Sequence, residues 1–148
     1  VGGGMVGAET ADFLAEQGHE VSVIEMRDAI GPDVIHEHRI FLMEAFEKYG
    51  IEQITSAAVS EIFSDGVSCK NAADKSDETI YEARGFDTVV LSMGFSSRYT
   101  HRDGQNVVYD FADELKDIVP EVHVVGDAVR ARRALDATKE AYDVALKL

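Results

Sequence analysis

Three glycines near the start of the chain have the spacing of an anion-binding turn. Gly2, Gly4 and Gly7 occupy the glycine positions of G-x-G-x-x-G. In such a turn the first glycine permits a sharp exit from a strand, the second lets backbone N–H groups approach a diphosphate, and the third lets the next helix pack closely. The N-terminus of that helix favours an anion. We therefore expect this turn, with Met5 and Val6 at the helix start, to hold the diphosphate of a dinucleotide.

A carboxylate follows at the spacing that a dinucleotide site requires. Glu25 ends the β-branched run 21–24 and lies 18 positions after Gly7, close to the ~20 expected of the acid that binds the adenosine ribose. Met26 and Arg27 come next and should border the same ribose. A carboxylate repels the 2′-phosphate of NADPH, whereas an arginine can neutralise it. Because Glu25 holds the deciding position, we expect NADH rather than NADPH, and we interpret Arg27 as a stacking or solvent-facing residue.

The elements that must position these residues predict an α/β fold. Helical periodicity covers 5–17 and 34–49, and short apolar runs at 21–24 and 51–54 predict strands. From residue 57 the period becomes two, and the Asp65-Gly66 pair predicts a hairpin within a three-stranded antiparallel meander that ends near residue 83. We expect a Rossmann-like, mainly parallel sheet flanked by helices.

Two later apolar runs extend this prediction. The runs 87–94 and 122–126 are typical of buried parallel strands. They would give a sheet of four or five strands, with 122–126 at its edge. Between them, 95–119 predicts a connector with one helical turn, and 131–148 predicts a closing helix.

Composition excludes several classes of function. The 148 residues carry 14 basic and 28 acidic side chains, a formal charge of −14, which argues against nucleic acid or an anionic membrane as partner. The single cysteine, Cys69, excludes an internal disulfide and a C-x-x-C centre. The scattered histidines offer no metal site. With no signal peptide and no apolar run of membrane-spanning length, we expect a cytoplasmic protein.

The opening of the chain carries a further expectation. Only Val1 precedes the first glycine, and a Rossmann unit needs several apolar residues there for its first strand. We therefore interpret the sequence as an excerpt of a longer protein.

Three stretches together resemble one enzyme group. They are GGGMVGAETADFLAEQGHEVSVIE, DTVVLSMG and VHVVGDAVRARRALDATKEAYDVAL. Their order is similar to the pyridine-nucleotide half of the two-dinucleotide-domain flavoproteins of the pyridine nucleotide-disulfide oxidoreductase type. The detail most resembles the C-terminal region of the NADH:flavin oxidoreductases of the old yellow enzyme superfamily, such as 2,4-dienoyl-CoA reductase.

The resemblance implies cofactors and further site residues. Residues 1–95 would bind NAD(H), and 96–148 would be a connector and part of an incomplete FAD-binding domain. Glu9 would face the nicotinamide end, and Gly94 would close the nicotinamide site. The Gly126-Asp127 pair would bind the flavin ribityl chain, with Ala128 beside the flavin. FAD itself, the rest of its domain and the flavin-binding barrel would come from the parent enzyme.

The function implied is the positioning of NADH for hydride transfer to FAD, with no catalysis by this chain alone. Two alternatives stay open. One is a fragment of a disulfide-reductase-like NADH oxidase or ferredoxin reductase. The other is a non-catalytic module that holds ADP for structural reasons. From the residues alone, Glu9 could be only a first-turn acid, Gly94 only a turn, and Asp127 only the N-cap of the last helix.

Overall fold

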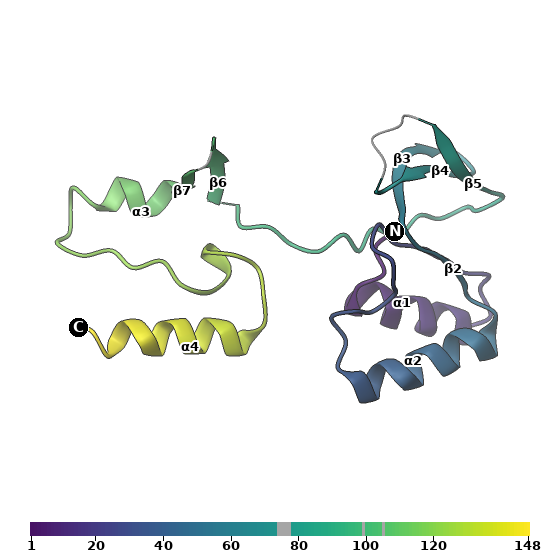
Figure 1. The fold of residues 1–148 in the computed structure, drawn as a ribbon, viewed down its shortest axis with the longest axis horizontal. Coiled ribbons are helices and arrows are strands. Elements are labelled where there is room, and N and C mark those ends of the chain that lie inside the picture. Colours follow the sequence, from purple (N-terminus) through teal and green to yellow (C-terminus); the bar gives the residue numbers. More distant parts are fainter. Residues whose placement is uncertain (74–77, 99, 105) are drawn as a thin grey trace. The chain divides into compact units, whose positions relative to one another are not determined.

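The computed structural model describes residues 1–73, 78–98, 100–104 and 106–148. It divides the chain into two compact units, Val1–Gly94 (unit 1) and Phe95–Leu148 (unit 2) (Figure 1). None of the helices in the described ranges is long and apolar enough to cross a membrane.

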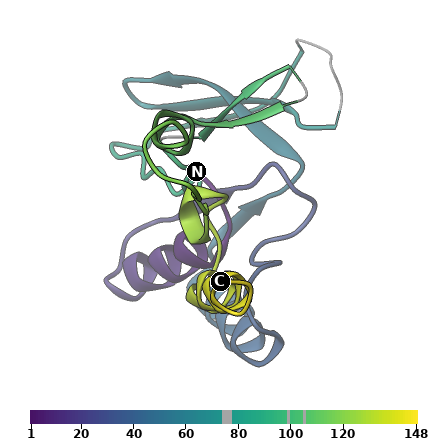
Figure 2. The same ribbon diagram turned by 90° about the vertical axis from the view of Figure 1, so that its left-hand side faces the viewer.

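Unit 1 begins with a helix followed by a βαβ unit. Its elements are α1 (Met5–Glu16), β1 (Ser22–Ile24), α2 (His36–Tyr49) and β2 (Glu52–Ile54). The two strands pair in parallel, and α1 and α2 lie side by side (Figures 1 and 2). Small buried residues on α1, including Ala8 and Ala11, let it pack closely over the core centred on Phe46 of α2. Gly50 ends α2 in the left-handed conformation, at φ 67°, as the helix pattern predicts.

The three-stranded meander is confirmed. Its strands are β3 (Ala57–Phe63), β4 (Gly66–Asn71) and β5 (Thr79–Arg84), in the order β3-β4-β5 and antiparallel throughout. The meander forms a layer separate from the helix pair of unit 1 (Figure 2). The predicted hairpin joins β3 to β4 at Asp65-Gly66. Residue 66 has to be a glycine, because a Cβ there would lie 1.8 Å from the carbonyl oxygen of Ala83 on β5. Cys69 is fully buried in the second core, which the meander shares with Ile24.

The predicted strand at 87–94 is wrong. This segment is not part of any sheet, and among the described residues its backbone hydrogen bonds to the rest of unit 1 are with Val1: the amino group of Val1 donates to the Val90 carbonyl (2.8 Å), and Ser92 N–H donates to the Val1 carbonyl (2.7 Å). A ladder needs hydrogen bonds to several consecutive residues of a partner strand, and Val1 alone does not provide them. Among the described residues, the parallel sheet therefore has two strands rather than four or five.

Unit 2 contains an unpredicted hairpin, β6 (Thr100–Asp103) with β7 (Asn106–Tyr109). The expected helical turn is present as α3 (Asp110–Leu115), and a short 3₁₀ turn, η1 (Gly126–Ala128), follows. The closing helix, α4, spans Ala134–Ala145. The predicted edge strand at 122–126 is also wrong, because 121–125 has no assigned structure and Gly126 enters η1.

Candidate functional site

Two glycines of the turn are required by close backbone contacts. Gly2 has φ +98°, and a Cβ there would lie 2.3 Å from the carbonyl oxygen of Ser92. A Cβ on Gly7 would lie 1.8 Å from the carbonyl oxygen of Gly2. Contacts this short leave no room for any side chain. Gly7 therefore lets the first turn of α1 rest directly on the backbone of Gly2, and Gly2 lets the backbone at Ser92 pass close to the turn.

Gly4 is different, because the packing of the chain does not require a glycine there. It caps α1 with ordinary extended angles, φ −69° and ψ −175°, and the nearest atom to a built Cβ is Asp33 Oδ2 at 3.4 Å. Its lack of a side chain leaves the backbone open to a ligand. Met5 N–H donates to Asp33 Oδ2 at 3.2 Å, while the N–H groups of Val6 and Gly7 have no acceptor among the described residues. The α1 N-terminus thus fits a diphosphate.

Glu25 lies at the carboxyl end of β1, as the spacing predicts, but it is buried, with 5% of its surface exposed. Its Oε2 accepts the N–H of Gly3 (2.7 Å), and its Oε1 accepts both N–H and Nε of Arg27 (2.9 and 3.0 Å). Burial alone would raise the pKa of Glu25, but the N–H groups of Arg27 and Gly3 and the guanidinium hold it below its usual value. The buried side chain is therefore a carboxylate.

Gly3 is a site residue that sequence reasoning missed. A Cβ there would lie 2.6 Å from Ile30 Cδ1 and 3.0 Å from Glu25 Cβ. The available signal was the unbroken run of three glycines, in which the middle one lies outside the motif. Gly3 lets the backbone come close enough to Glu25 for its N–H to reach the carboxylate.

Arg27 is half exposed, in line with the expectation of a solvent-facing residue. It also forms an ion pair with Glu25, which the sequence did not suggest, and its Nη2 lies 3.8 Å from Asp33 Oδ1. Met26 is 64% exposed beside it. Asp33 was also missed by sequence reasoning, since nothing in its spacing connects it to a turn 28 residues earlier.

Glu9 and Gly94 are also in unit 1 and lie outside the cluster of hydrogen bonds and ion pairs formed by Gly3, Glu25, Arg27 and Asp33. The Glu9 carboxylate is half exposed and lies 3.0 Å from His38 Nε2 on α2, a partner that the sequence did not suggest. Gly94 has φ +82° and open space around it. A glycine is favoured at this position because φ is positive, and packing does not require one.

The Gly-Asp pair of unit 2 forms the 3₁₀ turn η1. Gly126 has φ +65°, and its N–H donates to Glu140 Oε2 of α4 at 2.7 Å. The guanidinium of Arg132 pairs with the same carboxylate, and with the Gly126 bond it lowers the pKa of Glu140. Asp127 Oδ1 accepts the N–H of Arg132 at 3.2 Å. Because α4 begins at Ala134, Asp127 is not its N-cap. The turn presents an exposed carboxylate, and the Ala128 carbonyl accepts the Thr100 hydroxyl.

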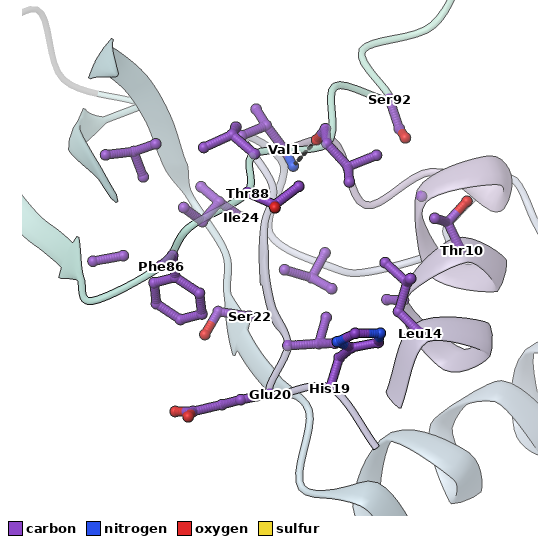
Figure 3. Close-up of a pocket in the computed structure, with 18 of the residues that line it drawn as sticks. Val1, Thr10, Leu14, His19, Glu20, Ser22, Ile24, Phe86, Thr88 and Ser92 are labelled. Carbon is purple, nitrogen blue, oxygen red and sulfur yellow. Dashed lines mark hydrogen bonds between the residues drawn. The ribbon is translucent and has the colours of Figure 1, made fainter. Parts of the chain in front are cut away.

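A cavity of about 460 Å³ in unit 1 lies beside α1 rather than at its N-terminus (Figure 3). Its walls include Leu14 of α1, β1, and Phe86 and Val89 of the extended segment. Val1 lies at one end, bonded to that segment, and the next residue, Gly2, donates to the Ile24 carbonyl of β1 at 2.8 Å. The walls are mainly apolar, although Thr10, His19 and Thr88 also line the cavity, and they include the acidic Glu20 and Asp87. Because apolar and acidic walls do not suit a diphosphate, we do not assign this cavity to the nucleotide.

The structure thus gathers part of the predicted site around the start of α1. The gathered residues are Gly2, Gly4, Met5, Val6, Gly7, Glu25 and Arg27, with Gly3 and Asp33 in addition. Gly126, Asp127 and Ala128 form a second, separate group in unit 2.

Comparison with known proteins identifies the family of the chain. A profile of the family described as "Pyridine nucleotide-disulphide oxidoreductase" matches residues 1–145. An NADH oxidase of Thermoanaerobacter brockii is 33% identical over the whole chain, which covers 21% of that protein. A bilirubin reductase of Mediterraneibacter gnavus is 44% identical over 94 residues, which are 64% of this chain and 14% of that protein. The chain therefore spans about a fifth or less of these relatives.

Among solved structures, a 2-naphthoyl-CoA reductase complex matches 99% of this chain and 20% of its own, with a TM-score of 0.68 and 27% identity. The relatives are oxidoreductases of a family that uses NAD(H) and FAD. The fold, the glycine turn on α1 and the match over nearly the full length lead to one conclusion: the chain belongs to the pyridine nucleotide-disulphide oxidoreductase family.

Proposed function

We propose that unit 1 is the NADH-binding part of a flavin-dependent oxidoreductase. The observation that carries the proposal is the N-terminus of α1, where Gly4 places no side chain in front of the backbone and the N–H groups of Val6 and Gly7 have no acceptor among the described residues. The helix dipole adds to their attraction for an anion. When bound, NADH supplies a hydride and FAD accepts it. The role of this chain is to hold the dinucleotide in place.

Glu25 would hold the adenosine ribose. Its Oε2 accepts a hydrogen bond from Gly3, and a carboxylate oxygen has a second lone pair that can accept a ribose hydroxyl. The charge of Glu25 would repel a 2′-phosphate, which favours NADH over NADPH. Glu9 and Gly94 would lie toward the nicotinamide, and the Gly126–Ala128 turn would contact FAD in a second nucleotide domain, to which 96–148 would belong.

The parent enzyme would resemble the NADH:flavin oxidoreductases of the old yellow enzyme superfamily. The likeness to a 2-naphthoyl-CoA reductase supports this assignment. The likeness to an NADH oxidase and to dihydrolipoyl dehydrogenases supports the alternative, a disulfide-reductase-like enzyme, which stays open. In such an enzyme, electrons would pass from NADH through FAD to a flavin in a separate barrel domain. The competing candidate, a module that holds ADP structurally, would use the same glycine turn and the same ribose acid.

Calorimetric titration with NADH, NADPH and ADP tests the proposal. We expect NADH to bind more tightly than NADPH, and Gly4→Val to abolish binding without unfolding the chain, because its Cβ has room in the protein but would block the diphosphate. A circular dichroism melt checks that the variant is folded. ADP binding as tight as NADH binding would favour the structural module. Equal binding by the wild type and Gly4→Val would refute the assigned position.

A further inference from the structure

The N-terminus of α1 already carries an anion, the carboxylate of Asp33. Its Oδ2 accepts the N–H of Met5 at 3.2 Å. Its two oxygens lie 3.4 and 3.5 Å from the position that a Cβ on Gly4 would take. The carboxylate therefore lies over the glycine whose backbone a diphosphate has to approach. A diphosphate and this carboxylate would compete for the same positive helix end.

The backbone of the loop that carries Asp33 is held in place by a buried side chain and a backbone hydrogen bond. Ile30 is 1% exposed, and the N–H of Gly31 donates to the carbonyl of Gly3 at 2.6 Å, which ties the loop to the glycine turn. The Asp33 side chain itself is half exposed. A fixed backbone with a half-exposed side chain allows the carboxylate to rotate away while the loop stays in place.

Arg27 is shared between the two carboxylates. Its Nε is bonded to Glu25 Oε1 at 3.0 Å, while its Nη2 lies 3.8 Å from Asp33 Oδ1. Removing the Asp33 charge would leave the outer nitrogens of the guanidinium available to an incoming phosphate. Asp33 would thus act on the nucleotide in two ways. It occupies the N-terminus of α1, and it pairs with the guanidinium of Arg27, the cationic side chain of this cluster.

We propose that Asp33 is an internal competitor of the nucleotide diphosphate. Its carboxylate has to leave the N-terminus of α1 when a nucleotide binds, and it lowers the affinity for every nucleotide that carries a diphosphate. This inference rests on the proposed function and adds an affinity-setting residue to it. The effect is common to NADH and ADP, because both present the same diphosphate.

The test is calorimetry with NADH and ADP on the wild type, Asp33→Asn, Asp33→Ala and Asp28→Asn. Asparagine keeps an oxygen for the Met5 N–H but loses the charge, and alanine removes both. Asp28 is an exposed acid of the same loop, so its variant has the same net charge as Asp33→Asn. We expect both Asp33 variants to bind NADH and ADP about two- to fivefold more tightly, and Asp28→Asn to bind like the wild type.

Three results would overturn the inference alone. The first is wild-type binding with no gain in either Asp33 variant, which leaves the proposed function intact. The second is a gain in Asp33→Asn alone, because the new amide donors would then explain it. The third is an equal gain in Asp28→Asn, which would make the effect one of net charge. Absence of binding by all four proteins would overturn the proposed function and this inference with it.

Discussion

The buried carboxylate of Glu25 should contribute to folding as well as to ribose binding. Glu25→Gln tests this, because the variant keeps the size of the side chain but has a single carbonyl oxygen for the donors that now reach two oxygens. If that oxygen keeps the bonds from Arg27, the amide NH₂ faces the N–H of Gly3 and leaves it unpaired. A charge-assisted hydrogen bond is worth about 1.5–3 kcal/mol, and an unsatisfied buried donor costs about 1–3 kcal/mol. We expect a loss of about 3 kcal/mol at pH 7.

The pH dependence gives a second, independent measurement. The pKa of Glu25 is lowered in the folded chain. Its contribution to stability is therefore fully present above its unfolded value of about 4.3 and is lost as the pH falls through the lower folded value. The difference between wild type and Glu25→Gln should shrink as the pH is taken from 6 toward 3, within about the range in which carboxylates titrate.

Urea unfolding followed by circular dichroism at several pH values measures both effects. Glu61→Gln serves as the control, since Glu61 is an exposed acid of β3 and its substitution should change the free energy of unfolding by less than about 0.5 kcal/mol. The reasoning fails if Glu25→Gln is as stable as Glu61→Gln at pH 7. It also fails if the loss persists undiminished in acid, because then the charge is not its source.

Three further predictions concern other parts of the chain. Gly7→Ala should lower the free energy of unfolding, measured in urea, by about 3 kcal/mol or more, because its Cβ would lie 1.8 Å from a carbonyl oxygen. Gly4→Ala should lower it by less than about 1 kcal/mol. Similar losses in the two variants would contradict the packing argument. Glu140→Ala should speed amide hydrogen exchange at Gly126 while the α4 circular dichroism signal is kept, and unchanged exchange would mean that the turn does not depend on this bond. Burial raises the pKa of the Cys69 thiol, so its reaction with a thiol reagent should require unfolding and rise with urea; rapid labelling of the native chain would contradict this.

Local signals predicted the parts of the fold that depend on neighbours in sequence. The Asp65-Gly66 turn, the glycine that ends α2 and the period-two pattern of the meander all act over a few residues, and the structure has each of them. The apolar runs 87–94 and 122–126 were misread because an apolar run becomes a strand only where a partner strand lies beside it. Among the described residues, the backbone of the first run is hydrogen-bonded to Val1, which is not part of a strand.

The candidate site was predictable in the same uneven way. The glycine turn and the position of Glu25 at the end of a strand could be predicted, because both follow from the order of strand, turn and helix along the sequence. The bonds that define the site, from Gly3 to Glu25 and from Met5 to Asp33, join residues 22 and 28 positions apart. Such bonds depend on how closely α1 packs on the loop after β1, and no sequence spacing encodes that distance.

The bond between Gly3 and Glu25 also limits how the proposed preference for NADH could be altered. The usual exchange for NADPH, an arginine in place of Glu25, would bury a second guanidinium against Arg27 and leave the Gly3 N–H without its acceptor. A protein engineer who selected for NADPH use at that position would recover mostly unfolded variants. The accessible route is Met26, which is 64% exposed and can become a phosphate-binding arginine or lysine while the buried carboxylate stays in place.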